Sequence, residues 1–279
     1  MNEKQLRVVW FAGGDGAALL EKDEVLAIIP PWSGSEGFQG YARECHIKSP
    51  FCWPLPDHPA LYERIQKSDE FWNSWGGDDS PWNRCEPKLL EAYEKIFGPV
   101  VNYFSIDGGQ WPPKTLAQFN WENLLVVLTV GVSSCPQPLV EMRFDVPDRH
   151  RRIEFAACFN SDAPASLVTS FCQYMGGQSK LPWSNQSCFS HGHTISCDLF
   201  LKSQLLPDFS SVLLGSQAEL PVTQIELPKL EGDPLNLLWM IPVFENERKY
   251  LQETHNFSLI NQIICDFPVP VISNRAMVV

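Results

Sequence analysis

The sequence lacks the long hydrophobic run that a transmembrane helix needs, because no stretch approaches about 18 consecutive apolar residues. It also lacks a charged-then-apolar leader, since residues 1–5 pass directly into a strand-like run, so we expect no secretory signal. Charged residues are scarce, at 19% against 44% hydrophobic residues, which excludes an intrinsically disordered chain. With 279 residues, the chain can bury a sizeable core without disulfide bonds.

Basic residues are in the minority, with 21 Lys and Arg against 33 Asp and Glu, a net charge of −12. The deficit is even: residues 1–120 carry 11 basic and 17 acidic side chains, and residues 121–279 carry 10 and 16, so each part has a net charge of −6. Binding to nucleic acid or to an anionic membrane depends on Lys and Arg, so both are disfavoured. A basic protein partner fits this negative charge, because electrostatic attraction between oppositely charged surfaces raises the association rate. The alternative is that the negative charge has no binding role, since many soluble intracellular proteins are acidic.

No C-x-x-C motif is present, and the nine cysteines are odd in number and irregularly spaced. A secreted disulfide framework normally has an even count in a small domain. Several cysteines lie among apolar residues, as Cys158 does between Ala157 and Phe159. The pattern therefore predicts reduced, buried thiols in a cytoplasmic protein.

The first half of the sequence predicts a β-hairpin followed by helices. Residues 8–11 and 25–29 are rich in β-formers, with turn glycines at 13–16, a further strand at 17–20 and a second turn at 22–23. Apolar residues at helical spacing predict helices over 59–75 and 87–97, with Pro87 in the first turn of the second. Residues 100–106 form an expected strand.

The second half is richer in strands. The apolar run 124–130 predicts a central strand that is covered on both faces. The alternation in 140–146 predicts a strand that pairs as a hairpin with 153–159. A helix follows, with Ser161 and Asp162 before it and the glycines at 176–177 at its end. The remaining expected elements are strands over 185–197, 208–214, 221–227 and 235–244 and a last helix over 245–264.

Motifs for catalysis or metal binding are weak. The glycine-rich segment 13–16 joins two strands and lacks both G-x-G-x-x-G spacing and a following helix, so it predicts a hairpin turn. His191 and His193 would share one face of a strand and could hold a metal ion with Cys197, but a second ligand pair is missing. A polar pair in a strand or turn, without a metal, is the alternative. Asp78 and Asp79 lie in a polar context that favours solvated carboxylates.

Tryptophan is the unusual residue of this chain. Ten are present, and six of them fall in segments rich in Pro and Gly: Trp32, Trp53, Trp72, Trp75, Trp82 and Trp111. Such residues either fill the space between a sheet and its loops or anchor a protein interface. We take Trp32, Trp53, Trp75, Trp82 and Trp111, together with Asp78 and Asp79, as candidate partner-binding residues.

Several short motifs follow one another in a recognisable order. Residues 128–133 fit a T-x-G-x-S pattern. Residues 140–147 fit the next segment of the same series, which contains Glu or Arg, apolar residues and then Pro. Strand-like segments at 193–196 and 212–214 come next, and residues 237–247 fit a closing apolar strand that is followed by Glu and a helix. The series, over about 87–268, resembles the suppressor-of-fused-like domain.

This resemblance implies a non-enzymatic protein-binding domain. Animal members of the family bind and restrain a transcription factor, whereas stand-alone bacterial members resemble immunity proteins that neutralise a toxin; the short chain favours the bacterial type. The expected fold is α+β, with a mixed or antiparallel sheet flanked by helices. Residues 1–86 would form an N-terminal hairpin and helix extension packed on the core, 87–268 the domain, and 269–279 a C-terminal tail.

The leading hypothesis is therefore a cytoplasmic inhibitor or immunity protein that occludes a protein partner, possibly a basic toxin domain, without a cofactor. One alternative is a hydrolase or metal-dependent enzyme with a Cys/His centre around His191, His193 and Cys197. A second alternative is a small-molecule-binding protein that uses an aromatic cleft.

Overall fold

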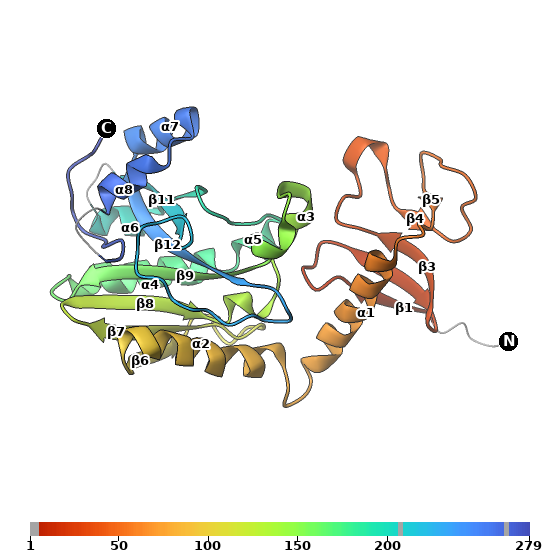
Figure 1. The fold of residues 1–279 in the computed structure, drawn as a ribbon, viewed down its shortest axis with the longest axis horizontal. Coiled ribbons are helices and arrows are strands. Elements are labelled where there is room, and N and C mark those ends of the chain that lie inside the picture. The colour runs from red at the N-terminus through yellow and green to blue at the C-terminus, as the bar shows by residue number, and fades with distance from the viewer. Residues whose placement is uncertain (1–5, 206–208, 265–267) are drawn as a thin grey trace.

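The computed structural model describes residues 6–205, 209–264 and 268–279, except for the side chains of residues 199 and 200. Its strands form two separate sheets, a five-stranded sheet near the N-terminus and a seven-stranded sheet built from the rest of the chain. The two sheets lie side by side and are joined through the long helices α1 (Pro59–Ser74) and α2 (Pro81–Phe97) (Figure 1). The predicted boundary at residue 86 falls inside α2.

The N-terminal sheet has the strand order β1-β2-β3-β4-β5. Its strands are β1 (Leu6–Trp10), β2 (Ala17–Glu21), β3 (Glu24–Ile29), β4 (Tyr41–Ala42) and β5 (Trp53–Pro54). The expected hairpin and its further strand are confirmed, with β2 between β1 and β3. One face packs on α1, since Val9, Ala18 and Ile28 are buried against Leu61 and Ile65.

The larger sheet has the order β10-β11-β12-β9-β8-β7-β6. Neighbouring strands are antiparallel except for β12 and β9, which run parallel. The strands are β6 (Val100–Ser105), β7 (Thr115–Trp121), β8 (Leu124–Val130), β9 (Arg152–Asn160), β10 (Thr194–Ser196), β11 (Phe209–Ser216) and β12 (Leu235–Phe244).

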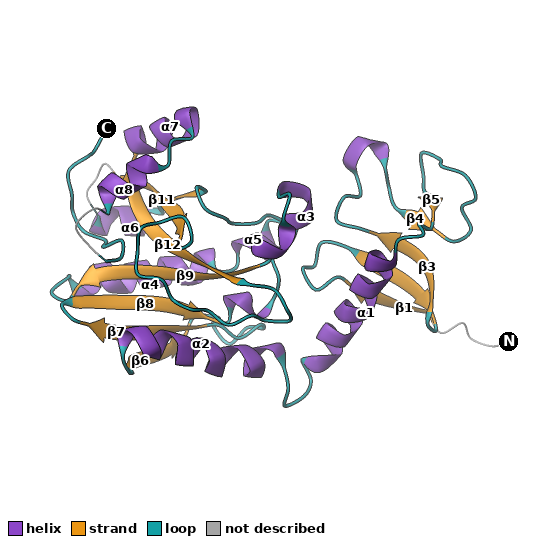
Figure 2. Ribbon diagram, viewed as in Figure 1, coloured by secondary structure: helices purple, strands orange, loops and turns teal. Residues whose placement is uncertain are grey.

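Helices cover both faces of this sheet (Figure 2). On one face, Leu89 and Tyr93 of α2 pack with Val126 and Leu128 of β8. On the other face, Phe171 of α4 (Ala165–Gln178) packs in a second cluster that includes Val127. Because alternate β8 residues enter opposite clusters, the whole strand is apolar, which confirms the expected central strand.

Short helices and the C-terminal segment complete the fold. The helices are α3 (Val140–Arg143), α5 (Leu181–Ser184), α6 (Leu199–Gln204), α7 (Glu245–Thr254) and α8 (Ser258–Ile263). The segment after residue 268 lies on the core: Val269 and Ile272 are buried, and the Ile272 amide donates to the Cys158 carbonyl at 2.7 Å. The guanidinium of Arg275 forms two 2.6 Å bonds with the fully buried carboxylate of Glu247.

Several local predictions are wrong. Residues 140–143 form α3, not a strand, because Leu139 adopts a left-handed conformation and the alternation places Glu141 toward arginines instead of along a sheet. The partners of β9 are therefore β8 and β12. In 185–197 only β10 is a strand, and the described segment 221–227 contains no strand. The predicted helix over 245–264 is broken at His255, which has a φ of 54°.

Two helix boundaries also differ from expectation. Helix α2 begins at Pro81, where the Ser80 hydroxyl accepts from the Asn83 amide, so Pro87 lies inside the helix and not in its first turn. Helix α4 begins after Pro164 and continues through Gly176 and Gly177. The Ser80 cap sets the start of α2, whereas α4 starts after Pro164 without a side-chain cap.

Eight cysteines are free thiols, six of them buried, while Cys45 and Cys52 are partly exposed. Cys265 and the predicted start of a strand at residue 208 lie outside the described residues, as do residues 1–5. Among the described helices, none combines the length and the apolar character that crossing a bilayer requires.

Candidate functional site

The T-x-G-x-S motif surrounds a buried carboxylate. Glu154 of β9 accepts hydrogen bonds from the Thr129 hydroxyl at 2.5 Å, the Gly131 and Ser133 amides at 3.0 and 2.9 Å, and the Ser133 hydroxyl at 2.6 Å. On the other side of the turn, Arg152 donates to the carbonyls of Ser133 and Ser134. Each named motif position therefore supplies a donor to one side chain. Since Glu154 is fully buried, the motif holds the fold and presents nothing to a ligand.

The N-terminal sheet is attached to the larger unit through the turn between β1 and β2. The side chain of Asp15 in this turn is fully buried; its carboxylate accepts from the Leu139 amide at 2.8 Å and lies 3.3 Å from Arg64 of α1. Arg64 also pairs with Glu141 of α3 at 2.7 Å. Burial raises the pKa of Asp15, although Arg64 opposes the shift. The predicted hairpin turn thus also serves as a docking contact between the two sheets.

Aromatic side chains from both units meet beside this junction. Trp111, in the loop between β6 and β7, contacts Trp72 and Trp75 at the end of α1, with ring centres 5.6 and 4.9 Å apart. Phe71 packs against the same two indoles. Trp72 also donates its indole N–H to the Trp10 carbonyl at 2.7 Å. Of the five candidate tryptophans, Trp75 and Trp111 are brought together, and Trp111 is more than half exposed.

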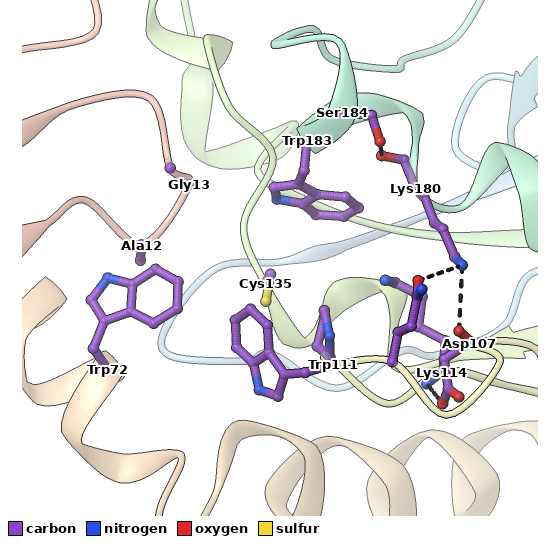
Figure 3. A pocket seen from close by; sticks show the side chains of 13 residues that line it. Ala12, Gly13, Trp72, Asp107, Trp111, Lys114, Cys135, Lys180, Trp183 and Ser184 are labelled. Carbon is purple, nitrogen blue, oxygen red and sulfur yellow. Dashed lines mark hydrogen bonds between the residues drawn. The ribbon is translucent and has the colours of Figure 1, made fainter.

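A cavity of about 290 Å³ opens next to these rings. Figure 3 shows the indoles of Trp72, Trp111 and Trp183 around it, with Cys135 between them. Lys114 and Lys180 are further lining residues. Lys114 is only 4% exposed, and its ammonium lies 5.4 Å from the centre of the Trp183 ring. Lys180 donates to the Asp107 carbonyl and the Gln110 side chain at 3.4 and 3.3 Å.

The N-terminal sheet presents a second unusual surface, its outer face opposite α1. Leu6, Val8 and Trp10 of β1 and Ile29 of β3 are between 52% and 58% exposed. The register aligns Val8 with Leu19 and Ala27, and Trp10 with Ala17 and Ile29, so these residues share one face. We call this surface the outer apolar face. The next row along the strands pairs Leu6 with Glu21 and Glu24, which gives the face an acidic border.

The other predicted partner-binding residues lie apart. Trp53 of β5 packs edge-on against Phe38 and has the Lys48 ammonium 4.1 Å from its ring centre. Trp32 packs on the N-terminal core. Trp82 of α2 packs on the larger core, where a Cβ at Gly131 would lie 2.2 Å from its ring. Asp78 and Asp79 are exposed between α1 and α2, and Asp79 pairs with Arg84 at 3.1 Å.

The histidine pair does not lie on a strand as expected. His191 and His193 lie in the turn before β10, with Gly192 between them at a φ of 83°. Each Nδ1 accepts a backbone N–H, from Ser216 at 3.1 Å and from Ser190 at 3.3 Å. Burial lowers the pKa of both imidazoles and raises that of the Cys197 thiol to about 11. No group of three or more His, Cys, Asp or Glu residues is arranged for a metal ion within the described part of the chain.

Sequence reasoning missed Lys114, Trp183 and the outer apolar face. Lys114 gives no signal in a single sequence because it follows two prolines in an irregular segment. The face had a detectable signal, since β1 is apolar at every position except Arg7. A strand of a half-covered sheet normally alternates.

The seven-stranded sheet with helices on both faces defines an α+β domain. A family model described as "Suppressor of fused protein" matches residues 104–273, which is more than half of the chain. The chain therefore belongs to the suppressor of fused protein family, as its motifs suggested. The match begins near the end of β6, so the N-terminal sheet, α1 and α2 lie outside it.

Two solved structures are also similar. A crystal structure of the Sufu-Fu complex has 10% identity and a TM-score of 0.45, over 69% of this chain and 93% of that chain. The structure of Drosophila Suppressor of Fused has 12% identity and the same TM-score, over 70% of this chain and 52% of that chain. No curated protein matches the chain.

Proposed function

We propose that this protein is a protein-binding module that inhibits its partner by covering part of the partner's surface. The proposal includes the finer hypothesis of a cytoplasmic immunity protein of the bacterial type that neutralises a basic toxin domain. Family membership supports the binding class. The Sufu-Fu complex is a precedent for protein binding by a relative, as its name states. Free thiols at eight described cysteines fit a reducing compartment.

The observation that carries the proposal is the outer apolar face. Monomeric proteins seldom leave a contiguous apolar surface open on regular strands, and such surfaces mark interaction sites. Each exposed side chain belongs to a paired strand whose opposite face is packed, so the whole surface is preformed. A preformed apolar surface loses little conformational entropy when a partner binds.

The acidic border of the outer apolar face favours a basic partner. Glu21 and Glu24 lie in the row next to Val8, and the turn between them holds Lys22 and the fully exposed Asp23, which lies 3.9 Å from Arg7. Glu24 already has Arg43 at 2.9 Å, but both side chains remain solvent-accessible. Together with the net charge of −12, this border fits a protein surface with apolar side chains flanked by Lys and Arg. A second copy of this chain would bring two acidic borders together.

The aromatic junction is a candidate rim of the same interaction. Trp111 is exposed beside Trp75, and Asp78 and Asp79 follow Trp75 in the chain. Acidic side chains next to an exposed indole are suited to binding a basic surface, as is the acidic border of the outer apolar face. Trp32, Trp53 and Trp82 are partly buried and stay in this proposal as further candidates. Alanine substitution at each distinguishes a binding anchor, whose loss weakens partner binding, from a core residue, whose loss lowers the stability of the fold.

Capture from native lysate of the source cells tests the proposal. We expect one stoichiometric partner of basic charge that is released as salt is raised and that Val8→Glu no longer captures. Val146→Glu is the matched control, since Val146 is also about half exposed (49%) but lies on the larger unit. For the inhibitor hypothesis, co-expression should protect cells from the toxicity of the captured partner. Absence of a stoichiometric partner, or equal capture by both variants, contradicts the proposal.

A further inference from the structure

The cavity at the junction is lined by the nearly buried side chain of Lys114, for which no ion pair is described. The side chain of Lys114 is almost completely buried, and its ammonium forms no hydrogen bond or ion pair with any described residue. Its nearest described interaction is with the face of Trp183, at 5.4 Å. Burial lowers the pKa of Lys114, although the charges of Glu154 and Asp107 oppose the shift. An anion in the cavity would favour the charged form of this ammonium.

The other charged groups in the cavity leave an excess of positive charge. Lys180 is a second ammonium, and its two described acceptors are a carbonyl and an amide oxygen, which are uncharged. Asp107 is the one carboxylate in the lining. Its oxygens accept from the Ser105 hydroxyl and from the Gly109 and Lys114 amides, so they are occupied by local turn contacts. Burial raises the pKa of the Cys135 thiol to about 11, so this group is neutral. Two ammonium groups against one carboxylate give a net charge of +1.

The walls and the size of the cavity define the rest of the ligand. Trp72, Trp111 and Trp183 surround the space with flat apolar surfaces (Figure 3). A volume of about 290 Å³ is at the lower limit of ligand pockets, which suits one or two fused rings. Trp183 is fixed by its indole N–H, which donates to the Pro136 carbonyl at 2.9 Å. The site therefore exists before a ligand arrives.

We propose that this cavity binds a carboxylate attached to a flat apolar group, with the carboxylate at Lys114 and Lys180 and the ring among the three indoles. Such a group occurs in a free aromatic acid and at a chain end that finishes with an aromatic residue. Trp111 lines this cavity and is also a candidate rim residue of the proposed partner surface. Titration of the isolated protein with small acids needs no partner, so failure of this inference and failure of the proposed function are distinguishable.

Calorimetric titration of the full-length protein tests the inference with matched pairs of probes. Indole-3-acetate and 3-phenylpropionate are compared with their uncharged amides. We expect both acids to bind and each amide to bind at least about tenfold more weakly, because a hydrogen bond to a charged group is worth more than a neutral one. Equal binding of acid and amide, or no binding of either acid at millimolar concentration, overturns the inference.

Substitutions locate the site. Lys114→Met keeps the length of the side chain and removes its charge, and it should weaken binding of the acids at least about tenfold. Lys48→Met is the control, since Lys48 also lies over an indole, that of Trp53, but outside the cavity. Unchanged binding by Lys114→Met, or equal loss in both variants, contradicts the assignment. Should Lys114→Met not fold, the acid and amide pairs on the unmodified protein decide the question alone.

A third comparison identifies the source of the carboxylate. A short peptide that ends in phenylalanine is titrated as the free acid and as the C-terminal amide. Tighter binding of the peptide acid than of 3-phenylpropionate assigns the cavity to a chain end, and the reverse order assigns it to a free aromatic acid. Both orders support the carboxylate site, whereas equal affinity for peptide acid and peptide amide contradicts it.

Discussion

The buried carboxylate of Glu154 makes the stability of this protein depend on pH in a way that one substitution should remove. In Glu154→Gln, the remaining oxygen can keep the three bonds from Gly131 and Ser133. The new amide N–H would point at the Thr129 hydroxyl oxygen, whose proton can turn toward the Phe155 carbonyl 3.4 Å away. The variant therefore keeps the shape of the site and loses only its titration.

The size of the effect follows from the pKa. Burial raises the pKa of Glu154 to about 7, against 4.5 for an unperturbed glutamate, even though its four hydrogen bonds oppose the shift. Each pKa unit corresponds to about 1.4 kcal/mol, so the whole effect is about 3 kcal/mol. Because the folded pKa is raised, the stabilising contribution is fully present below pH 4.5 and is lost as the pH rises through 7.

Urea unfolding of both proteins at pH 5 and pH 8 measures this difference. Other titrating groups, including Asp15 and the histidines, are common to both proteins and cancel in the comparison. Relative to Glu154→Gln, the natural protein should lose about 2–3 kcal/mol of unfolding free energy between these pH values. If the difference between the two proteins is the same at both pH values, Glu154 does not titrate in this range and the reasoning is wrong.

Three further changes have expected outcomes. Gly131→Ala should destabilise the fold by more than about 1 kcal/mol in urea unfolding, because Gly131 has a φ of 97° and its Cβ would overlap Trp82; Gly177→Ala, at an open helical position, is the control. Arg275→Ala should cost about 3–5 kcal/mol, since it leaves the Glu247 carboxylate buried without its cation, and hydrogen exchange after residue 268 should rise. Trp111→Ala should weaken partner binding by about 2 kcal/mol if this exposed indole is an anchor, and should leave it unchanged if the ring only covers Trp75.

Elements that leave a local pattern in the sequence could be predicted from it. The apolar run of β8 and the helical spacing of α1 were predicted to within one residue, because burial on both faces or on one face leaves a direct pattern. The T-x-G-x-S motif was found, but its purpose was not, since Glu154 lies more than twenty residues away in the chain. Only the pairing of β8 with β9 brings the donors to this carboxylate.

Where tertiary contacts decide the structure, the local sequence pattern predicts the wrong element. Residues 140–146 alternate like a strand, yet Glu141 faces Arg64 and Arg151 and the segment becomes α3. Loop tryptophans could not be divided into core and surface residues, because Trp82 and Trp111 have similar Pro- and Gly-rich surroundings and differ only in what packs on them. The cavity at Lys114 joins residues from both units and therefore leaves no trace in the linear pattern.

The most direct test of the central claim is the affinity of the captured partner for the natural protein, for Val8→Glu and for Val146→Glu. A partner that docks on the outer apolar face should form a one-to-one complex whose dissociation constant rises at least about tenfold in Val8→Glu and stays unchanged in Val146→Glu. Equal affinities for all three proteins would contradict the account, because the exposed face of the N-terminal sheet would then take no part in binding.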